Sequence, residues 1–222
     1  MLKLVQTADG SNTIFNEAVG ENYHSRNGAL QESRHVFVEA GLNYFVQQTN
    51  AKKASVLEVG FGTGLNFLLT AEECQQRDIE LNYTSIEAYP LTPELISKTG
   101  YEQYISNKLW QDFLTSYPNP LKAGKIDLEI ATCPLLDFQS DKHFDIIYFD
   151  AFAVANQPEM WNEEAIGHTV KFIKPGGVFV TYAITGNLKR MLKSLGFTIQ
   201  KIPGAAGKRE MLRAIRFENV LI

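Results

Sequence analysis

Hydrophobic and polar positions along the chain form blocks that predict strands and helices in alternation. Short apolar, β-branched runs predict seven strands of one sheet, at about residues 55–59, 81–87, 126–131, 144–149, 178–182, 197–202 and 211–217. Apolar residues at helical spacing predict helices at 65–77, after Pro93, within 101–121, at 162–172 and at 186–195. This alternation predicts an α/β fold with a mostly parallel sheet. The last two strands have no helix between them and predict an antiparallel edge hairpin.

The first fifty residues show a different pattern. Two short runs on either side of Asp9-Gly10 predict a β-hairpin over residues 2–15, because Asp-Gly is a strong turn signal. Ser33 then predicts the start of an amphipathic helix. We therefore expect an N-terminal β-hairpin and helical extension at 1–50, followed by one Rossmann-like domain at 51–222.

Composition excludes several classes of protein. The chain has 222 residues, 45% of them hydrophobic, and no apolar run approaches the roughly twenty residues that a membrane span needs. Its start lacks the long apolar segment of a signal peptide, and its two cysteines, Cys74 and Cys133, lie in unrelated contexts. We therefore expect a cytoplasmic protein without a membrane anchor, a disulfide framework or a metal site.

Charge is distributed unevenly. The net charge is −4 with a pI near 5.6, which argues weakly against a nucleic-acid-binding protein. From Gly186 onward, however, eight basic residues accompany two acidic ones, Glu210 and Glu218. The basic ones are Lys189, Arg190, Lys193, Lys201, Lys208, Arg209, Arg213 and Arg216. Such a segment can bind phosphates, but it equally fits an ordinary solvated surface, and charge alone leaves both interpretations open.

Three glycines at alternate positions, Gly60, Gly62 and Gly64, separate the first strand of the predicted sheet from the following helix. Because glycine has no Cβ, the backbone can bend sharply there and a ligand can approach it closely. The spacing fits the dinucleotide pattern G-x-G-x-x-G poorly and matches E-x-G-x-G-x-G, which is typical of methyltransferases. An ordinary glycine-rich turn is the alternative. The residues of this stretch expected to bind a cofactor are Glu58, Gly60, Phe61, Gly62, Thr63, Gly64 and Asn66.

Two further acidic residues follow predicted strands. Glu87 ends the second strand, where a carboxylate can accept hydrogen bonds from both ribose hydroxyls, although it could also be an ordinary strand-end charge. Asp137 follows the third strand and is a loose candidate for contacting adenine.

Asp150 ends the fourth strand, in the crevice where a parallel sheet binds its ligands. Methyl transfer from a sulfonium to an amine moves positive charge onto nitrogen, and a fixed carboxylate here would stabilise that charge and orient the amine. Phe152 and Trp161 follow and could stack on a base taken out of an RNA stack. The alternatives are that Asp150 caps the next helix and that both aromatic residues belong to the core.

Several of these motifs occur together in one known family. The stretches that carry the resemblance are Tyr23-His24-Ser25 with Gly28 and Glu32-Ser33, Glu58–Phe67, Glu87–Leu91, Asp150–Ala153, Pro158–Trp161, Lys174–Gly177 and Gly207–Leu212. On these motifs, nearly the whole chain resembles the methyltransferase half of the bifunctional tRNA wobble-uridine enzyme MnmC, also found as the stand-alone enzyme MnmD. The order of elements likewise resembles the seven-stranded fold of class I S-adenosylmethionine-dependent methyltransferases.

The resemblance implies an activity and a set of roles. S-adenosylmethionine would be the cofactor and tRNA the partner, and 5-aminomethyl-(2-thio)uridine at the wobble position would be converted to its 5-methylaminomethyl derivative. Asp150 and Phe152 would be catalytic, with Asp150 also beside the cofactor. The residues with implied substrate-binding roles are Tyr23, His24, Ser25, Arg26, Trp161, Lys208 and Arg209. Val154 stands where many relatives have proline, so we expect a different loop rigidity there.

The chain stops where the two-domain relatives continue into a flavin-dependent oxidase. We therefore expect it only to methylate, with a separate oxidoreductase or an upstream tRNA-modifying enzyme supplying the aminomethyl substrate. Three other functions stay open. One is a small-molecule amine or hydroxyl methyltransferase, which the acidic body of the chain favours and its basic final segment opposes. The others are a nicotinamide-dependent dehydrogenase and a non-catalytic module that binds RNA or a partner.

Overall fold

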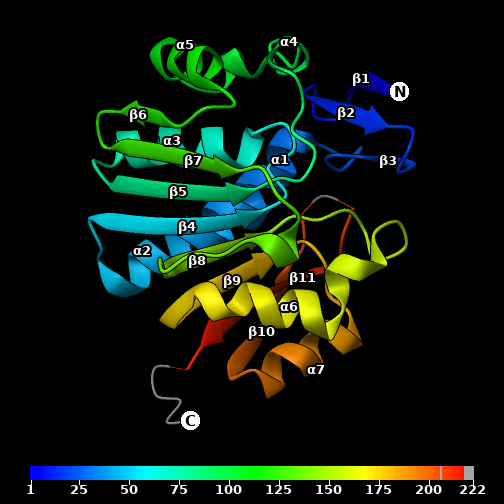
Figure 1. The fold of residues 1–222 in the computed structure, drawn as a ribbon, viewed down its shortest axis with the longest axis vertical. Helices are drawn as coiled ribbons and strands as arrows, with labels where there is room; N and C mark the ends of the chain where they lie inside the picture. The colour runs from blue at the N-terminus through cyan, green and yellow to red at the C-terminus, as the bar shows by residue number, and fades with distance from the viewer. Residues whose placement is uncertain (206, 218–222) are drawn as a thin grey trace.

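A central eight-stranded sheet dominates the computed structural model, which describes residues 1–205 and 207–217 (Figure 1). Glu218, counted above with the final segment, lies outside the described residues. In spatial order the strands are β10 (Phe197–Pro203), β11 (Glu210–Arg216), β9 (Ile173–Thr181), β8 (Phe144–Phe149), β4 (Lys53–Val59), β5 (Glu80–Ile86), β7 (Ile126–Ala131) and β6 (Leu121–Ala123).

The strands from β9 to β7 run parallel, whereas β11 is antiparallel to both β9 and β10. The predicted parallel sheet with an antiparallel edge hairpin is therefore confirmed. The sheet has one strand more than the seven predicted, because β6 pairs antiparallel with β7 at the opposite edge. Gly124, with a φ of 65°, forms the tight turn that joins them. The stretch 101–121 is thus helical only in part, and its end belongs to the sheet.

Helices cover both faces of the sheet. Figure 1 shows α6 and α7 in front of it and the segments around α1, α2 and α3 behind it. The helices after β4 are α3 (Leu65–Gln76), α4 (Pro93–Ile96), α5 (Asn107–Ser116), α6 (Glu163–Thr169) and α7 (Gly186–Ser194). Short 3₁₀ turns lie at η2 (Tyr101–Gln103), η3 (Leu135–Asp137), η4 (Pro158–Trp161) and η5 (Val170–Phe172).

The predicted N-terminal hairpin is confirmed as β1 (Leu2–Gln6) and β2 (Asn12–Asn16), and a short third strand, β3 (Glu21–Asn22), joins them in a separate sheet. In Figure 1 this small sheet lies beside the carboxyl ends of the central strands. The N-terminal part of the chain therefore stands at the edge where a parallel sheet binds its ligands.

A continuous helical segment follows, and it begins earlier than predicted. It consists of α1 (Ala29–Ser33), the π-helical η1 (Arg34–Asn43) and α2 (Tyr44–Thr49). Ser33 is therefore not the helix start, and its side chain is buried within the segment. The first N–H groups are instead capped by the hairpin turn: Ser11 Oγ accepts from Ala29 N at 3.1 Å, and Asp9 Oδ2 accepts from Gln31 N at 3.0 Å.

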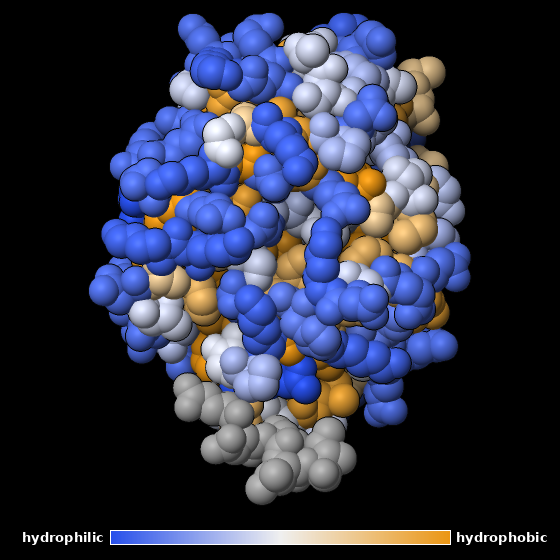
Figure 2. Space-filling view, turned by 60° about the vertical axis from the view of Figure 1, so that its left-hand side comes forward, coloured by the Kyte–Doolittle hydropathy of each residue, from blue (hydrophilic) through white to orange (hydrophobic). Residues whose placement is uncertain are grey.

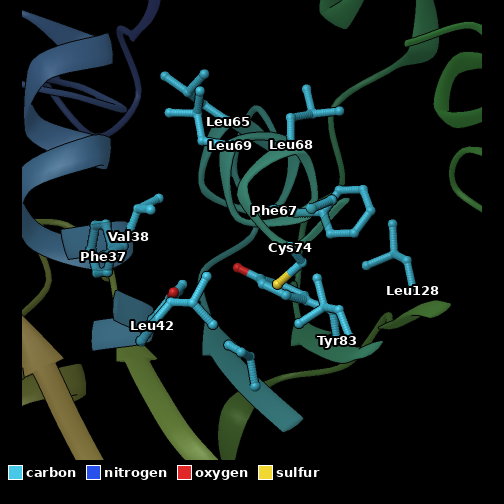
Figure 3. Close-up of a cluster of buried hydrophobic side chains, with 14 of the residues drawn as sticks. Phe37, Val38, Leu42, Leu65, Phe67, Leu68, Leu69, Cys74, Tyr83 and Leu128 are labelled. Carbon is cyan, nitrogen blue, oxygen red and sulfur yellow. The ribbon is translucent and has the colours of Figure 1, made fainter. Parts of the chain in front are cut away.

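Side chains on the two faces of the sheet form two hydrophobic clusters. Val56 of β4 joins the cluster under α3, whereas the neighbouring Leu57 joins the cluster on the opposite face, as strand alternation requires. Figure 3 shows Phe67 of α3 pointing toward Tyr83 and Leu128 of the sheet. The buried core therefore fixes α3, and with it the turn that precedes it, relative to the strands.

The exterior contrasts with these clusters. Figure 2 shows a surface covered mainly by hydrophilic residues, with hydrophobic residues visible in narrow gaps between them. Within the described ranges 1–205 and 207–217, no helix combines the length and the apolar character needed to cross a membrane.

Replacing Phe67 with Ala is expected to lower the free energy of unfolding by about 3–5 kcal/mol. The ring is fully buried and packs edge-on against Tyr83 with 5.2 Å between ring centroids. Urea denaturation followed by circular dichroism measures the change. Gln75→Ala, at an exposed position of the same helix, is the matched control and should change stability by less than about 0.5 kcal/mol. Equal losses in the two variants would contradict the packing of α3.

Candidate active site

A cavity of about 920 Å³ opens at the carboxyl ends of β4, β5 and β8. Its walls come from the turns that follow these strands and from residues 16–26 of the N-terminal part. The acidic side chains that line it are Glu21, Glu32, Glu87, Asp150 and Glu159, and the basic ones are Arg26 and Lys208. The cavity therefore carries more negative than positive groups and favours ligands with positive charge.

The glycine turn forms one wall of this cavity. Gly60 has a φ of 89°, and a Cβ there would lie 2.6 Å from the carbonyl oxygen of Asp150. Gly62 has a φ of 53°, and a Cβ there would lie 2.8 Å from the Tyr23 ring. Both positions therefore need glycine for conformation and for space. Gly64 does not line the cavity; it caps the N-terminus of α3.

The side chains within the turn point into the core. Phe61 stacks on Tyr117 with 5.8 Å between ring centroids, and Thr63 shares a hydrogen bond of 3.0 Å with the Tyr101 hydroxyl. Both Phe61 and Thr63 are buried, although both residues border the cavity. They shape the turn by packing beneath it.

Glu87 lies at the cavity directly after β5. Its Oε2 accepts a hydrogen bond from Gly62 N at 3.0 Å, and its Oε1 accepts one from Tyr89 N at 2.9 Å. This geometry joins the ends of β4 and β5 and leaves a carboxylate at the cavity wall. Asp137, in contrast, is exposed and does not line the cavity, which is bordered in this region by Cys133 and Leu135. The expected adenine contact of Asp137 therefore has no geometric support.

Asp150 presents a half-buried carboxylate to the cavity. Its Oδ2 accepts a hydrogen bond from Asn66 Nδ2 at 2.8 Å. Burial, reinforced by the Glu32 carboxylate, raises the pKa of Asp150 to about 8. Near neutral pH this group can therefore both hold and release a proton.

Glu58 lies behind the glycine turn and not in the cavity. It is fully buried because strand alternation places it on the same face as Val56, under α3. Its partners are Asn66 Nδ2 at 2.9 Å and Ser85 Oγ at 3.1 Å. The expectation that Glu58 contacts the cofactor directly therefore has no geometric support, and Asn66 likewise does not line the cavity.

The loop after Asp150 is held by several hydrogen bonds. Phe152 packs edge-on against Tyr23 with 5.1 Å between ring centroids, so these two rings meet at the cavity. Trp161 Nε1 donates to the Phe152 carbonyl at 2.7 Å, and the indole is buried against Phe149. An indole N–H needs an acceptor when it is buried, and this one finds it in the loop. Trp161 is thus a core residue in this structure, contrary to its expected contact with a base.

Lys208 reaches into the cavity from the loop between β10 and β11. Its Nζ pairs with Glu32 Oε1 at 2.7 Å and lies 3.8 Å from the centroid of the Tyr182 ring. The other oxygen of Glu32 accepts a hydrogen bond from Ser25 N at 2.7 Å. The ammonium is therefore engaged inside the protein, which argues against the expected contact of Lys208 with phosphate. Arg209 is exposed and lies outside the cavity.

The remaining predicted residues lie at the rim or beneath it. His24 is buried with Nδ1 3.0 Å from Thr13 Oγ1, and burial lowers its pKa to about 4, so the ring is neutral at pH 7. Arg26 is exposed where it borders the cavity. Burial, with the charge of Glu87 adding to it, raises the pKa of Tyr23 to about 12.

Among the cavity-lining residues without a predicted role, three hold the loop after Asp150 in place. Glu21 Oε2 accepts from Ala153 N at 3.0 Å, which ties β3 to the loop after Asp150. Gln157 Oε1 accepts from Phe152 N at 3.1 Å. Tyr182 donates to the Ala151 carbonyl at 2.8 Å. Tyr182 follows β9 directly, so the strand-end argument that singles out Asp150 could have found it. Glu21 and Gln157 carry no comparable signal.

Comparisons with known proteins identify the family of the chain. The sequence profile of a family described as S-adenosyl-L-methionine-dependent methyltransferase matches residues 101–216, about half of the chain. The tRNA 5-methylaminomethyl-2-thiouridine biosynthesis bifunctional protein MnmC of Leptospira borgpetersenii serovar Hardjo-bovis (strain JB197) is 33% identical over 214 residues, which cover 90% of this chain and 33% of that protein. The protein of the same name from Marinobacter nauticus is 34% identical over 211 residues, 87% of this chain and 33% of that protein.

Solved structures show the same fold. The crystal structure of MNMC2 from Aquifex aeolicus aligns with a TM-score of 0.81 and 22% identity, covering 100% of this chain and 72% of that one. The N-methyltransferase NodS from Bradyrhizobium japonicum WM9 aligns with a TM-score of 0.53 and 17% identity, covering 88% of this chain and 100% of that one. The chain spans about a third of the length of the curated relatives it matches. It belongs to the S-adenosyl-L-methionine-dependent methyltransferase family, and S-adenosyl-L-methionine is its cofactor.

Proposed function

We propose that the chain methylates the exocyclic amine of 5-aminomethyl-(2-thio)uridine at the wobble position of tRNA, giving the 5-methylaminomethyl derivative. The observation that carries this proposal is the Asp150 carboxylate, which faces an acidic cavity directly beside the glycine turn. The names of the relatives from Leptospira borgpetersenii and Marinobacter nauticus supply the substrate.

The turn and its neighbours fit the cofactor. Glycine at positions 60 and 62 lets the turn pack closely against the Asp150 carbonyl and the Tyr23 ring at the cavity wall, and the Glu87 carboxylate at the same wall would accept hydrogen bonds from ribose hydroxyls. When bound there, S-adenosylmethionine supplies an electrophilic methyl group on a sulfonium. The protein has to place an amine in line with that methyl group and balance the charge that develops on nitrogen.

Asp150 is suited to both tasks. One carboxylate oxygen is fixed by Asn66, and the group can accept a hydrogen bond from the substrate amine, so that its charge opposes the positive charge on nitrogen. Because its pKa is about 8, it can also accept the proton that the methylated amine releases. Phe152 and Tyr23 present aromatic rings at the same cavity, where an unstacked base could rest.

The charges of the protein indicate where the amine and the phosphates of a tRNA substrate would lie. Five carboxylates against two basic groups make the cavity favourable for an ammonium group and unfavourable for phosphate. Phosphates would therefore lie at the cavity rim, where Arg26 is exposed, and outside the cavity, where Arg209 is exposed. A tRNA substrate would place the enzyme in the cytoplasm, and its aminomethyl group would come from a separate activity, such as an oxidoreductase.

Asp150→Asn is expected to lower kcat at least about a hundredfold while cofactor affinity changes less than about threefold. In the wild type, kcat/KM should rise with pH through about 8, because the pKa of Asp150 is raised and the useful carboxylate forms only above it. This inflection should be missing in Asp150→Asn, whereas the inflection of the amine itself should persist. Steady-state rates with labelled donor from pH 6 to 10 measure both. If the pH profile of kcat/KM in Asp150→Asn matched that of the wild type, Asp150 would have no role in the mechanism.

Arg26→Ala combined with Arg209→Ala is expected to weaken tRNA binding and to make the slope of log K against log salt less steep by about 1.5. Lys52→Ala combined with Lys122→Ala removes the same charge at the amino ends of the strands and should leave the slope unchanged. Fluorescence titration at several salt concentrations measures it. Equal slopes in the two double variants would mean that the tRNA phosphates contact residues other than Arg26 and Arg209.

Mass spectrometry of nucleosides from tRNA rich in 5-aminomethyl-(2-thio)uridine tests the reaction itself. Incubation with the protein and S-adenosylmethionine should convert that nucleoside to a product heavier by one CH₂ group. Labelled methyl groups found instead in a metabolite extract, with tRNA unlabelled, would favour a small-molecule amine methyltransferase.

A further inference from the structure

A buried hydrogen-bonded chain leads from β5 through β4 and α3 to the end of β8. Ser85 Oγ is 3.1 Å from Glu58 Oε2, Glu58 Oε1 accepts from Asn66 Nδ2 at 2.9 Å, and the same Nδ2 donates to Asp150 Oδ2 at 2.8 Å. Glu58, Asn66 and Ser85 are all buried. This chain connects the interior of the sheet with the carboxylate at the cavity.

Asn66 is the donor in both of its hydrogen bonds within this network. The two hydrogens of the Asn66 amide nitrogen go to two different carboxyl groups, so each carboxyl holds the amide in one orientation. The opposite orientation would place Asn66 Oδ1 against two carboxyl oxygens. As it stands, Oδ1 is buried and has no hydrogen-bond partner in the described part of the chain, an arrangement that costs stability. Asn66 therefore donates a hydrogen bond to Asp150, while its own acceptor atom, Oδ1, has no hydrogen-bond partner among the described residues.

The surroundings of Glu58 favour its neutral form. Its carboxyl is fully buried, no basic side chain among the described residues contacts it, and Asp150 lies one amide away. Burial first, and the charge of Asp150 as well, raise the pKa of Glu58 well above its usual range. A neutral Glu58 still accepts hydrogen bonds from Asn66 Nδ2 and Ser85 Oγ, and it avoids two buried negative charges on either side of one amide.

We propose that Asn66, held in place by a neutral Glu58, is a positioning residue that fixes one oxygen of Asp150 and leaves the other oxygen for the substrate amine. This inference rests on the proposed function only in what the second oxygen does. The fixed oxygen and the neutral Glu58 are properties of the protein without substrate.

Other charged groups also surround Asp150. Glu21 and Glu32 carry charge of the same sign, and Lys208 is paired with Glu32 and contacts the Tyr182 ring. The Tyr182 and Tyr83 phenols complete these surroundings. Among residues 1–205 and 207–217, Asn66 is the side chain that donates a hydrogen bond to the Asp150 carboxyl. Its removal should therefore favour the protonated form of Asp150.

The test follows the Asp150 carboxyl directly, by ¹³C NMR of protein labelled at aspartate carboxyl carbons, with the signal assigned by its loss in Asp150→Asn. We expect Asn66→Ala to raise the titration midpoint of Asp150 by about one pH unit or more, and Asn66→Asp, which keeps the side-chain shape, to raise it at least as far. Thr70→Val is the matched control, because Thr70 is buried one turn further along α3 and bonds the Tyr148 hydroxyl. It should leave the midpoint within about 0.3 unit.

Glu58→Gln tests the charge of Glu58 in the same experiment. Glutamine has the shape of the neutral acid, so the Asp150 midpoint should move by less than about 0.3 unit, whereas a charged Glu58 would give a clear fall on replacement. In turnover assays, Asn66→Ala should lower kcat about tenfold or more with cofactor affinity changed less than about threefold. A midpoint unmoved in both Asn66 variants, or a fall in Glu58→Gln, overturns the proposal. Because the titrations need no tRNA, they stand even if tRNA proves not to be the substrate.

Discussion

The close contact between two turns determines the rest of the site. The left-handed backbone at Gly60 brings its Cα against the Asp150 carbonyl, and Asp150 N donates to the Val59 carbonyl at 2.9 Å. The turn after β4 and the turn after β8 are therefore one packed unit. If the first turn binds the methyl donor and the second the acceptor, as we propose, the backbone alone would bring them close together.

The charged groups around the cavity, together with burial, set the properties of the Asp150 carboxyl. Carboxylates from β3, α1 and the ends of β5 and β8 surround a space in which Lys208 is already neutralised by Glu32. Burial first, and the nearby Glu32 carboxylate as well, raise the pKa of Asp150 to about 8, far above the usual value for an aspartate. A group with that pKa is useful at an amine, whereas a fully ionised surface carboxylate would be a poor proton acceptor.

The sequence predicts the parallel strands, the glycine turn and the position of Asp150 because each has a local signal, such as β-branched runs, alternate glycines or a strand-end acid. It does not predict the helix start at Ala29, because the capping groups come from Asp9 and Ser11 in a distant turn. The sequence also does not distinguish the environments of Lys208 and Arg209. Only the structure shows that the β10–β11 loop brings Lys208 to Glu32 of α1. The sequence likewise does not show that Trp161 is a core residue, because its indole N–H donates to a backbone carbonyl nine residues away.

The pairing of Lys208 with Glu32 joins the late part of the chain to the early part, and β11 lies between β9 and β10 although it is made after both. During synthesis on the ribosome, the glycine turn and Asp150 emerge well before the strand that completes the sheet. At that stage the glycine turn is present, but Lys208 has not yet been added to the cavity lining. The cavity that Lys208 helps to line is therefore complete only after β10 and β11 have been made and β11 has paired with β9.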